Sequence, residues 1–582
     1  MPFDSTTGIF TSATPDVALP DHPLTVYDFL FDLDRPCSSA PNAFVRPDSR
    51  GKTWLVDAET GRSLTFEEAR ERTLELAKAF DAMGLKEGTT LANVSNNTVD
   101  YPICAWAAWR QGAVVLTLNP AFTVSEMAMQ LEQVNKHYPV KVVIAAPQAA
   151  SVVKESCEKS GLASVQVVLM QEGTAVDGVV STFPSLDTVT AKFSAFPLPS
   201  KVVINPDEWL STVAYIGFSS GTTGPPKRIL LPAATIISNA VRGCAHYTHL
   251  GAQEMDEIGL ACMPFFGAAG LLHAALNWLY HGTCLVISPS FEPSTLFAAI
   301  GAHNVSQLVL SPPTAMMLVA TETTADLSRV TLVVSAGSPL ARKTASALHD
   351  MFKNAHIVQA YGQTEAMAIS FDINMFSAPF PSCGPLVPNA EVKVVSPSGE
   401  ALSPGQQGEL CVRAPGNALG YLDNEQANRE LFDSEGFLRS GDVCWINSNG
   451  LVYVVERIKE YIHTSDGSVA PAELEALLLE NPEVQDACVI GVVDGQRGQA
   501  PKAFIVPATG LKPALAASPA EHLAFVERLK HFVLAHKAPR FALKAVEFVD
   551  ALPKSPGGKL LRKELRALEA RRSAEAQVEA VL

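Results

Sequence analysis

The sequence predicts an α/β protein with a large multi-layer N-terminal domain on parallel sheets, a small antiparallel subdomain, and a small α+β C-terminal domain. Apolar strand-like runs alternate with helical patterns before about residue 380, which is typical of parallel α/β layers. Beyond it, short strands separated by Gly, Pro, Asn and Ser turns indicate an antiparallel subdomain. After residue 456 the chain has a strand and helix pattern of its own.

The individual elements follow from these patterns in chain order. In the first part we expect strands at 90–95, 114–118, 141–146, 306–311, 330–337 and 356–362, with a helix at 100–112. The antiparallel strands are expected within 390–400, 408–416 and 451–467. In the last part we expect helices at 470–482, 521–536 and 559–577, strands at 486–494, 502–507 and 544–550, and a surface loop near 508–520.

The length supports more than one domain. A chain of 582 residues exceeds what one hydrophobic core usually supports. We expect a large domain over residues 1–455 and a small domain over 456–582.

The composition limits the classes of partner. Apolar residues make up 47% and charged residues 18%, which fits a globular protein. The formal charge of -16 argues against a nucleic-acid partner, because binding phosphate needs a basic surface. Ten cysteines without metal-ligand spacing are typical of reduced, mostly buried thiols. The N-terminal residues do not resemble a secretory signal and the last three are not SKL, so we expect a cytoplasmic protein.

Residues 258–287 contain no Asp, Glu, Lys or Arg, a run long enough to span a bilayer. Several Gly, Pro, His and Asn residues interrupt it. We therefore expect a strand, a turn, a buried helix and a second strand, with no integral membrane segment. His273 and His281 fall eight residues apart on one face of that helix, and we expect both to be core histidines.

The stretch SSGTTGPPKRI at residues 219–229 has the parts of a polyphosphate cradle. Its glycines let backbone amides face a ligand, its hydroxyls add donors, and Lys227 adds a positive charge. It does not match the Walker pattern, since only two residues separate Gly221 from Gly224 and no Ser or Thr follows the lysine. An ordinary surface turn explains the stretch almost as well when it is taken alone.

Five stretches in order resemble the signatures of the adenylate-forming superfamily, which includes acyl- and aryl-CoA synthetases, 4-coumarate-CoA ligases, luciferases and peptide-synthetase adenylation domains. They are YIGFSSGTTGPPK, SAGSPL, YGQTE, the pair SGD and ERIKE, and PKSPGGKLLRKEL. The resemblance spans about residues 50–570. It implies a large AMP-binding domain followed by a small domain that swings about a hinge.

The resemblance implies activation of a carboxylic acid by ATP, with release of pyrophosphate, followed by transfer to CoA. Thr222, Thr223 and Lys227 would hold the β- and γ-phosphates, and Thr364 and Glu365 the α-phosphate, with Glu365 as the Mg²⁺ ligand. Asp442 would bind the ribose hydroxyls and Lys559 would bridge the carboxylate and AMP. The remaining ATP or AMP contacts expected by resemblance are Ser219, Ser220, Gly221, Gly224, Ala336, Gly337, Gln359, Ala360, Tyr361, Gly362 and Arg457.

Taken singly, several of these residues have ordinary structural explanations. Glu365 could be a carboxylate at a helix start, Asp442 a turn residue and Lys559 a solvated charge. Tyr361 could be a core aromatic residue.

The thiol-binding region departs from the family pattern. The hinge position usually holds Asp or Lys and here is Glu456. The following loop, which lines the thiol tunnel in the family, has His463, Gly467 and Ser468 where relatives often have Lys, Gly and Gln, with the glycine shifted by one position. We therefore expect the acceptor to be free CoA or, alternatively, a carrier-protein phosphopantetheine supplied in trans or another acceptor.

The acid pocket also departs from the pattern, because Phe266 and Gly267 stand where related ligases have a histidine after PF or MF. An amino-acid substrate is disfavoured, since the aspartate that binds its amino group is absent, and a neutral aryl or medium-to-long acyl acid remains. We expect a pocket lined by Phe265, Phe266, Gly267, Gly270, Ala360 and Met367. Tight helix packing explains the small residues at 267–270 equally well.

Arg228 is unexpected, because glycine is usual after the lysine in the family. We expect its side chain to point to solvent and leave the phosphate to Lys227. A scaffold protein on an inactive ligase fold is a further hypothesis, which the presence of Lys227, Glu365, Asp442 and Lys559 disfavours.

Overall fold

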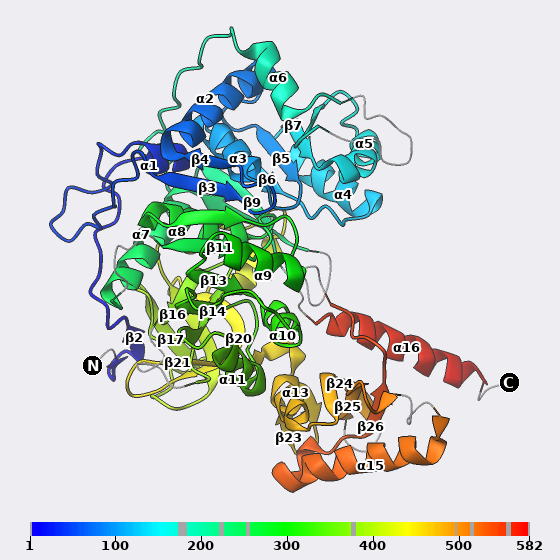
Figure 1. The fold of residues 1–582 in the computed structure, drawn as a ribbon. Coiled ribbons are helices and arrows are strands. Elements are labelled where there is room, and N and C mark those ends of the chain that lie inside the picture. The colour runs from blue at the N-terminus through cyan, green and yellow to red at the C-terminus, as the bar shows by residue number, and fades with distance from the viewer. Residues whose placement is uncertain are drawn as a thin grey trace.

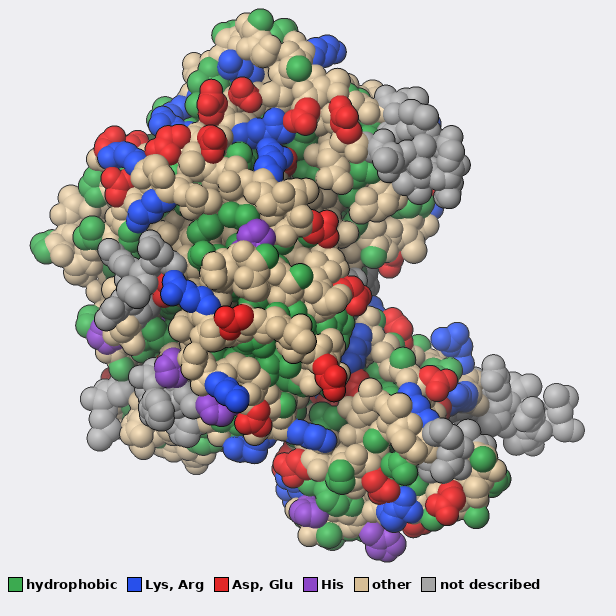
Figure 2. Space-filling view, in the orientation of Figure 1, with side chains coloured by type: hydrophobic (Ala, Val, Ile, Leu, Met, Phe, Trp, Pro, Cys, Tyr) green, Lys and Arg blue, Asp and Glu red, His purple; other side chains and the backbone are tan. Residues whose placement is uncertain are grey.

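The computed structural model describes residues 3–172, 183–219, 226–251, 257–373, 380–494, 498–512, 517–554 and 560–579, the side chains of the last stretch only to residue 572. The chain forms a large body and a smaller lobe that holds the C-terminal end (Figure 1). The space-filling view shows the same two parts, with a marked indentation where they meet (Figure 2).

The first sheet has seven strands in the order β19-β10-β9-β6-β5-β7-β8. The strands from β9 to β8 are parallel, and β10 and β19 are antiparallel to their neighbours. Helices between successive strands make the parallel connections possible. The strands are β5 (Thr90–Val94), β6 (Val114–Thr117), β7 (Val140–Ala145), β8 (Gln166–Leu169), β9 (Val213–Phe218), β10 (Arg228–Pro232) and β19 (Gly420–Tyr421).

The second sheet has eight strands in the order β16-β15-β14-β13-β11-β12-β3-β4. Its six inner strands are parallel and its two edge strands are antiparallel to their neighbours. The strands are β3 (Thr53–Asp57), β4 (Ser63–Thr65), β11 (Ile258–Ala261), β12 (Cys284–Ile287), β13 (Gln307–Leu310), β14 (Leu332–Ser335), β15 (His356–Gln363) and β16 (Met367–Phe371).

The two sheets and their helices form five layers. The main core lies between the sheets and contains side chains from α1, α2, α3, α7 and α8. Residues of α4 and α5 pack on the far face of the first sheet, and residues of α9, α10 and α11 on the far face of the second. These helices are α1 (Val26–Phe31), α2 (Phe66–Ala82), α3 (Asp100–Arg110), α4 (Val124–Asn135), α5 (Ala150–Lys159), α6 (Leu186–Phe193), α7 (Ala233–His249), α8 (Leu276–His281), α9 (Pro293–Ala302), α10 (Pro312–Val319) and α11 (Arg342–Met351).

An antiparallel sheet of six strands, in the order β1-β2-β17-β18-β20-β21, completes the large body. It brings the N-terminal strands beside strands from about 400 residues later in the chain, and buries one apolar face. Its elements are β1 (Phe3–Asp4), β2 (Ile9–Thr11), β17 (Glu391–Val395), β18 (Gly408–Arg413), β20 (Leu438–Ile446) and β21 (Val452–Arg457), with the nearby helix α12 (Glu425–Leu431).

The C-terminal lobe has a five-stranded sheet with apolar clusters on both faces. Helices α13 and α15 cover one face and α16 contributes Leu565 to the other. The elements are β22 (Ile462–Thr464), β23 (Gly467–Val469), α13 (Pro471–Glu480), β24 (Val484–Asp494), β25 (Gly498–Pro507), α15 (Pro519–His536), β26 (Ala545–Phe548) and α16 (Arg562–Glu579). The predicted combination of parallel sheets, an antiparallel subdomain and an α+β C-terminal part is confirmed.

The uncharged stretch 258–287 folds as expected into β11, a helix and β12. The helix begins with a π-helical segment, Ala269–Ala275, and continues as α8. Within the described ranges, no helix combines the length and apolar character needed to cross a bilayer. All ten cysteines are free and all but Cys284 are buried, as predicted for reduced thiols.

Candidate functional site

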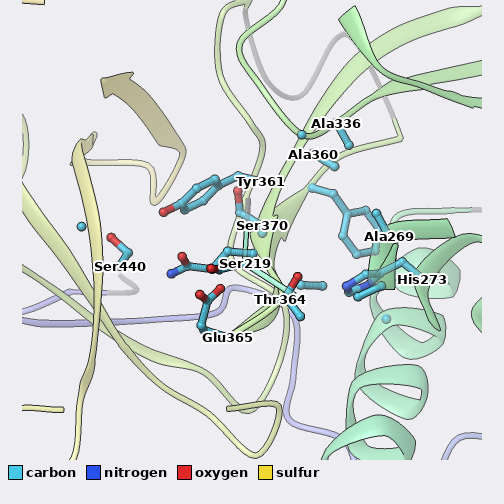
Figure 3. A pocket seen from close by; sticks show the side chains of 18 of the residues that line it. Ser219, Ala269, His273, Ala336, Ala360, Tyr361, Thr364, Glu365, Ser370 and Ser440 are labelled. Carbon is cyan, nitrogen blue, oxygen red and sulfur yellow. The ribbon is translucent and has the colours of Figure 1, made fainter. Parts of the chain in front are cut away.

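A cavity of about 860 Å³ lies where the second sheet, the antiparallel sheet and α7–α8 meet. Adjacent parallel strands place their carboxyl ends at one edge of a sheet, so the segments that follow β14 and end β15 both reach it. Figure 3 shows the cavity between Tyr361, Glu365 and Ser440 on one side and Ala269 and His273 on the other, with Thr364 between them. The predicted site residues that line it are Ser219, Lys227, Ala336, Gly337, Ala360, Tyr361, Gly362, Thr364, Glu365 and Arg457.

Asp442, Tyr361 and Arg457 form one connected polar group. The Tyr361 hydroxyl donates to Asp442 Oδ2 at 2.7 Å, and Arg457 Nε lies 3.1 Å from Asp442 Oδ1. Asp442 and Arg457 are directly opposite in the antiparallel pair β20–β21, so strand register brings them together. Burial, followed by the negative charge of Asp442, raises the pKa of Tyr361 well above its usual value, so its hydroxyl stays protonated and donates.

Glu365 and Lys227 both contact Tyr421, a residue that the sequence did not predict to lie in the site. The Tyr421 hydroxyl donates to Glu365 Oε1 at 2.9 Å, and Lys227 Nζ lies 4.5 Å from the centre of the Tyr421 ring. Tyr421 reaches this position because β19 pairs with β10 just after Lys227. No local sequence pattern identifies Tyr421 as a site residue, because its contact depends on strand pairing between segments about 190 residues apart.

The phosphate loop is described only at its two ends. The Ser219 amide donates to the Lys227 carbonyl at 2.9 Å, and the Lys227 amide donates to Ser219 Oγ at 3.1 Å. The chain therefore enters and leaves the loop side by side, at the ends of β9 and β10. Ser220, Gly221, Thr222, Thr223 and Gly224 lie outside the described residues, and so does Lys559.

Gln359 fixes the expected adenine-side turn through two hydrogen bonds to the backbone. Gln359 Oε1 accepts from the Leu340 amide and its Nε2 donates to the Pro381 carbonyl, both at 2.8 Å. Gln359 is buried and does not line the cavity, so it stabilises the backbone of the turn and forms no part of the cavity wall. Gly337 does line the cavity and has φ of +94°, a conformation that favours glycine.

The expected acid pocket needs correction. Five of its predicted residues do not line the cavity: Phe265, Phe266, Gly267, Gly270 and Met367. Phe265 is fully buried against Tyr101, and a Cβ at Gly270 would stand 2.2 Å from the Pro264 carbonyl oxygen. Tight packing therefore explains Gly270, whereas the neighbouring Ala268 and Ala269 do face the cavity.

The expectation that His273 and His281 are core histidines is confirmed only for the burial of His281, because both side chains also form part of the cavity wall. Both line the cavity, together with Asn277 and Trp278 from the same helix and Cys244 and Tyr247 from α7. A helix that forms a cavity wall shows the same apolar pattern as one that packs in a core, so the sequence could not separate the two cases.

The side chain of Arg228 does not point to solvent, contrary to expectation. Its Nη1 donates to Gln130 Oε1 on α4 at 2.9 Å, and burial lowers its pKa. It lies in extended backbone at the start of β10, without the positive φ that would require glycine.

We expect Arg228→Gly to leave the KM for ATP within about twofold of the wild-type value, because Arg228 faces α4 rather than the cavity. The free energy of unfolding should fall by about 1 kcal/mol, since a hydrogen bond and side-chain packing are lost. Steady-state kinetics and denaturant unfolding measure the two effects, with Lys227→Ala as the variant that raises the KM. A several-fold rise in KM for Arg228→Gly would contradict this placement.

The expected hinge residue Glu456 lies near the end of β21 in the large body, and its side chain joins a buried ionic cluster with residues of the C-terminal lobe. Its two carboxylate oxygens accept from the amides of Arg457 (2.9 Å) and Ala472 (2.8 Å), and Arg562 Nη2 lies 3.6 Å from Oε2. In the following hairpin, His463 Nδ1 and Ser468 Oγ are 3.1 Å apart, and Gly467 has φ of +125°. Their expected role in a thiol tunnel stays a prediction.

No group of three or more His, Cys, Asp or Glu side chains that could hold a metal occurs in the described part of the chain. A Mg²⁺ ion that shares substrate phosphates needs only one or two protein carboxylates. Glu365 meets that requirement, because it lines the cavity next to Thr364.

Comparison with family models gives matches over most of the chain. Residues 45–422 match the model described as AMP-binding enzyme, and residues 473–559 match the model described as AMP-binding enzyme C-terminal domain.

The chain is also similar to plant ligases. It is 32% identical to 4-coumarate--CoA ligase-like 2 of Arabidopsis thaliana over 97% of this chain and 94% of the relative. It is 31% identical to Probable CoA ligase CCL5 of Humulus lupulus, over 88% and 90%, and to Peroxisomal OPC-8:0-CoA ligase 1 of Arabidopsis thaliana, over 89% and 90%.

Solved structures share the fold. A benzoate CoA ligase from Burkholderia xenovorans LB400 aligns with a TM-score of 0.77 at 23% identity, over 93% of this chain and 100% of the other. ATP-bound MatB from Rhodopseudomonas palustris aligns with a TM-score of 0.77 at 22% identity, over 94% and 99%.

Proposed function

The chain belongs to the AMP-binding enzyme family, and on that premise we propose that it activates an organic carboxylic acid with ATP to acyl-AMP and pyrophosphate and then forms the CoA thioester. The acid is an aryl acid or a medium-to-long acyl acid. One observation carries the proposal: a single cavity is bounded by the ends of the phosphate loop, by Glu365, and by a wall of apolar and polar side chains from α7 and the helix over residues 269–281.

In the first step a carboxylate oxygen attacks the α-phosphorus of ATP and pyrophosphate leaves. Both reactants are anions, so positive charge and hydrogen-bond donors must offset their repulsion. Lys227 beside the loop hydroxyls Thr222 and Thr223 would hold the leaving phosphates, and Thr364 would donate to the α-phosphate. Lys559, from the C-terminal lobe, would bridge the carboxylate and the AMP oxygens.

Glu365 would hold Mg²⁺, which when bound neutralises phosphate charge. Its Oε1 already accepts from Tyr421, which fixes the orientation of the carboxylate. Asp442 would accept from the ribose hydroxyls while Tyr361 and Arg457 hold it in place.

In the second step the thiolate of CoA attacks the acyl carbon and AMP leaves. We propose that residues 456–582 rotate about Glu456 between the two steps, a rigid-body hinge motion. His463, Gly467 and Ser468 would then line the thiol tunnel. A cytoplasmic location stays a prediction.

Pyrophosphate release measured with a panel of aryl and acyl acids, with and without CoA, tests the proposal. We expect ATP- and acid-dependent pyrophosphate release together with a CoA thioester detected by mass spectrometry. No pyrophosphate with any acid would contradict the proposed function and favour a scaffold. Pyrophosphate without a CoA thioester would favour transfer to a carrier-protein phosphopantetheine in trans.

A further inference from the structure

Four polar side chains lie on one face of the buried helix α7, at intervals of four, three and four residues. They are Thr235, Asn239, Arg242 and His246. All four are buried, and each is bonded to the backbone of another segment. Of the four, Asn239 binds closest in sequence to Thr364 and Glu365, because its backbone partner is Ala368.

The turn that carries Thr364 and Glu365 joins β15 to β16 and has an irregular backbone. Met367, the first residue of β16, has φ of +57°, a left-handed conformation that is unfavourable for a residue with a side chain. Gly362 packs against it, since a Cβ at Gly362 would collide with the Met367 carbonyl oxygen. A residue keeps such a conformation only when its surroundings hold it there.

Asn239 supplies one of the bonds that hold this turn. Its Oδ1 accepts from the amide of Ala368, the residue directly after Met367, at 3.1 Å. On the other side of Met367, the Glu365 carbonyl accepts from the Ala418 amide at 2.7 Å. The two bonds fix the backbone on both sides of the left-handed residue, and with it the direction of the side chains that the turn carries.

The other end of the Asn239 amide reaches the wall of the cavity. Because Oδ1 is taken by the Ala368 amide, Nδ2 faces His273 Nδ1, at 3.4 Å, and donates to it. Burial lowers the pKa of His273 to about 4, so the ring is neutral at pH 7 and Nδ1 accepts. Figure 3 shows Thr364 between Glu365 and His273, so one buried side chain is bonded both to the turn and to the wall across the cavity from Glu365.

Resting on the proposed function, we propose that Asn239 is a positioning residue for acyl-adenylate formation, which holds the turn that carries Thr364 and Glu365 through the Ala368 amide and joins it to the cavity wall through His273. Asn239 does not itself line the cavity, so it acts through these partners and not by touching substrate. In the proposed mechanism the α-phosphate and Mg²⁺ both depend on this turn. Displacement of a catalytic group by about 1 Å costs about 10²-fold in rate.

The first test compares kcat and the KM for ATP, from acid-dependent pyrophosphate release, in Asn239→Leu and the wild type. Leucine is similar in size to asparagine but forms neither hydrogen bond. We expect kcat to fall by about 10- to 100-fold, because the turn loses its hold on one side. The KM for ATP should stay within about threefold, because Lys227 and Asp442 are unchanged.

Gln111→Leu is the matched control. Gln111 is also a buried amide bonded to a backbone group, since its Nε2 donates to the Ala77 carbonyl at 2.9 Å, but it lies at the end of α3 and does not line the cavity. This variant loses a comparable hydrogen bond and should keep the wild-type kcat.

Hydrogen exchange gives a second readout, which does not depend on the reaction. In the absence of substrates, peptides that cover residues 362–369 should exchange about tenfold faster in Asn239→Leu than in the wild type, whereas peptides that cover β5 should be unchanged. If thermal unfolding shows that Asn239→Leu fails to fold, Asn239→Ala, which loses the same two bonds without added bulk, replaces it in both measurements.

A folded Asn239 variant with the wild-type kcat, or with a higher KM for ATP and no fall in kcat, would overturn the inference. An equal fall in kcat in Gln111→Leu would do the same, since a general loss of stability would then explain both variants. Unchanged exchange of residues 362–369 would show that Asn239 does not hold the turn. No pyrophosphate from the wild type with any acid would instead refute the proposed function itself, while hydrogen exchange would still decide whether Asn239 holds the turn.

Discussion

Replacement of Lys559 by alanine is expected to reduce acyl-adenylate formation by about 10²- to 10⁴-fold. We propose that this lysine pairs with the carboxylate and AMP oxygens as their negative charges meet. A pair of unit charges at 4 Å and an effective dielectric constant of 20 is worth about 4 kcal/mol, or about three decades in rate if it is realised only in the transition state. Acid- and ATP-dependent pyrophosphate release measures this step.

The second half-reaction should be largely spared in Lys559→Ala. After rotation of the C-terminal lobe, a different face would meet the thiol, so CoA thioester formation from supplied acyl-AMP does not need this lysine. Lys554→Ala is a suitable control, because Lys554 belongs to the same segment but pairs with Asp486 at 2.6 Å within the lobe. Equal loss of both half-reactions would exclude the proposed role for Lys559.

Much of the fold could be predicted because alternating apolar patterns identify strands and helices without reference to tertiary structure. The neighbours of each strand could not be predicted in this way. Strands β3 and β4, from residues 53–65, extend the second sheet beyond β12 and leave no local signal of that pairing.

Part of the site could also be predicted from local sequence alone. Motifs identified the segments around Gly337, Thr364 and Asp442, since chemistry restricts residue types there. Contacts between distant segments, such as Tyr421 with Glu365, depend on strand register and were missed. Arg228 and His273 were misplaced, because sequence does not tell whether a polar side chain finds a buried partner or a cavity.

The second large expected effect concerns the buried ionic cluster formed by Arg562, Glu456, Glu460 and Glu475. This cluster connects the hinge residue Glu456 to the start of α16, just after Lys559. Arg562, three residues after Lys559, binds Glu475 through Nε at 3.1 Å and Nη2 at 2.6 Å. It also lies 3.6 Å from Glu456 and 3.7 Å from Glu460. Through Arg562 the start of α16 is fixed to the hinge residue, so these two segments should move as one body.

We expect Arg562→Met to destabilise the C-terminal lobe by about 3–5 kcal/mol at pH 7, because the buried carboxylates of Glu456 and Glu475 lose their nearest cation, while Glu460 keeps Arg566. All six tryptophans lie before residue 456, so their fluorescence does not report on this lobe. Hydrogen exchange of the β24 and β25 amides does, and their exchange should accelerate by about two to four decades. Arg571→Met, at an exposed position on the same helix, should have no comparable effect.

The loss of stability caused by Arg562→Met should depend on pH in a defined direction. Burial raises the pKa of Glu456 above 4.5, so the folded lobe binds its proton more tightly than the unfolded chain does. The stability contribution of such a group is present below its unfolded pKa and is lost as pH rises through its folded pKa. Removal of the neighbouring cation should raise the folded pKa further, so the deficit of Arg562→Met relative to wild type should be largest at neutral pH and should shrink as pH falls toward 4.5. A deficit that is independent of pH would show that the lobe loses packing around the Arg562 side chain rather than charge pairing.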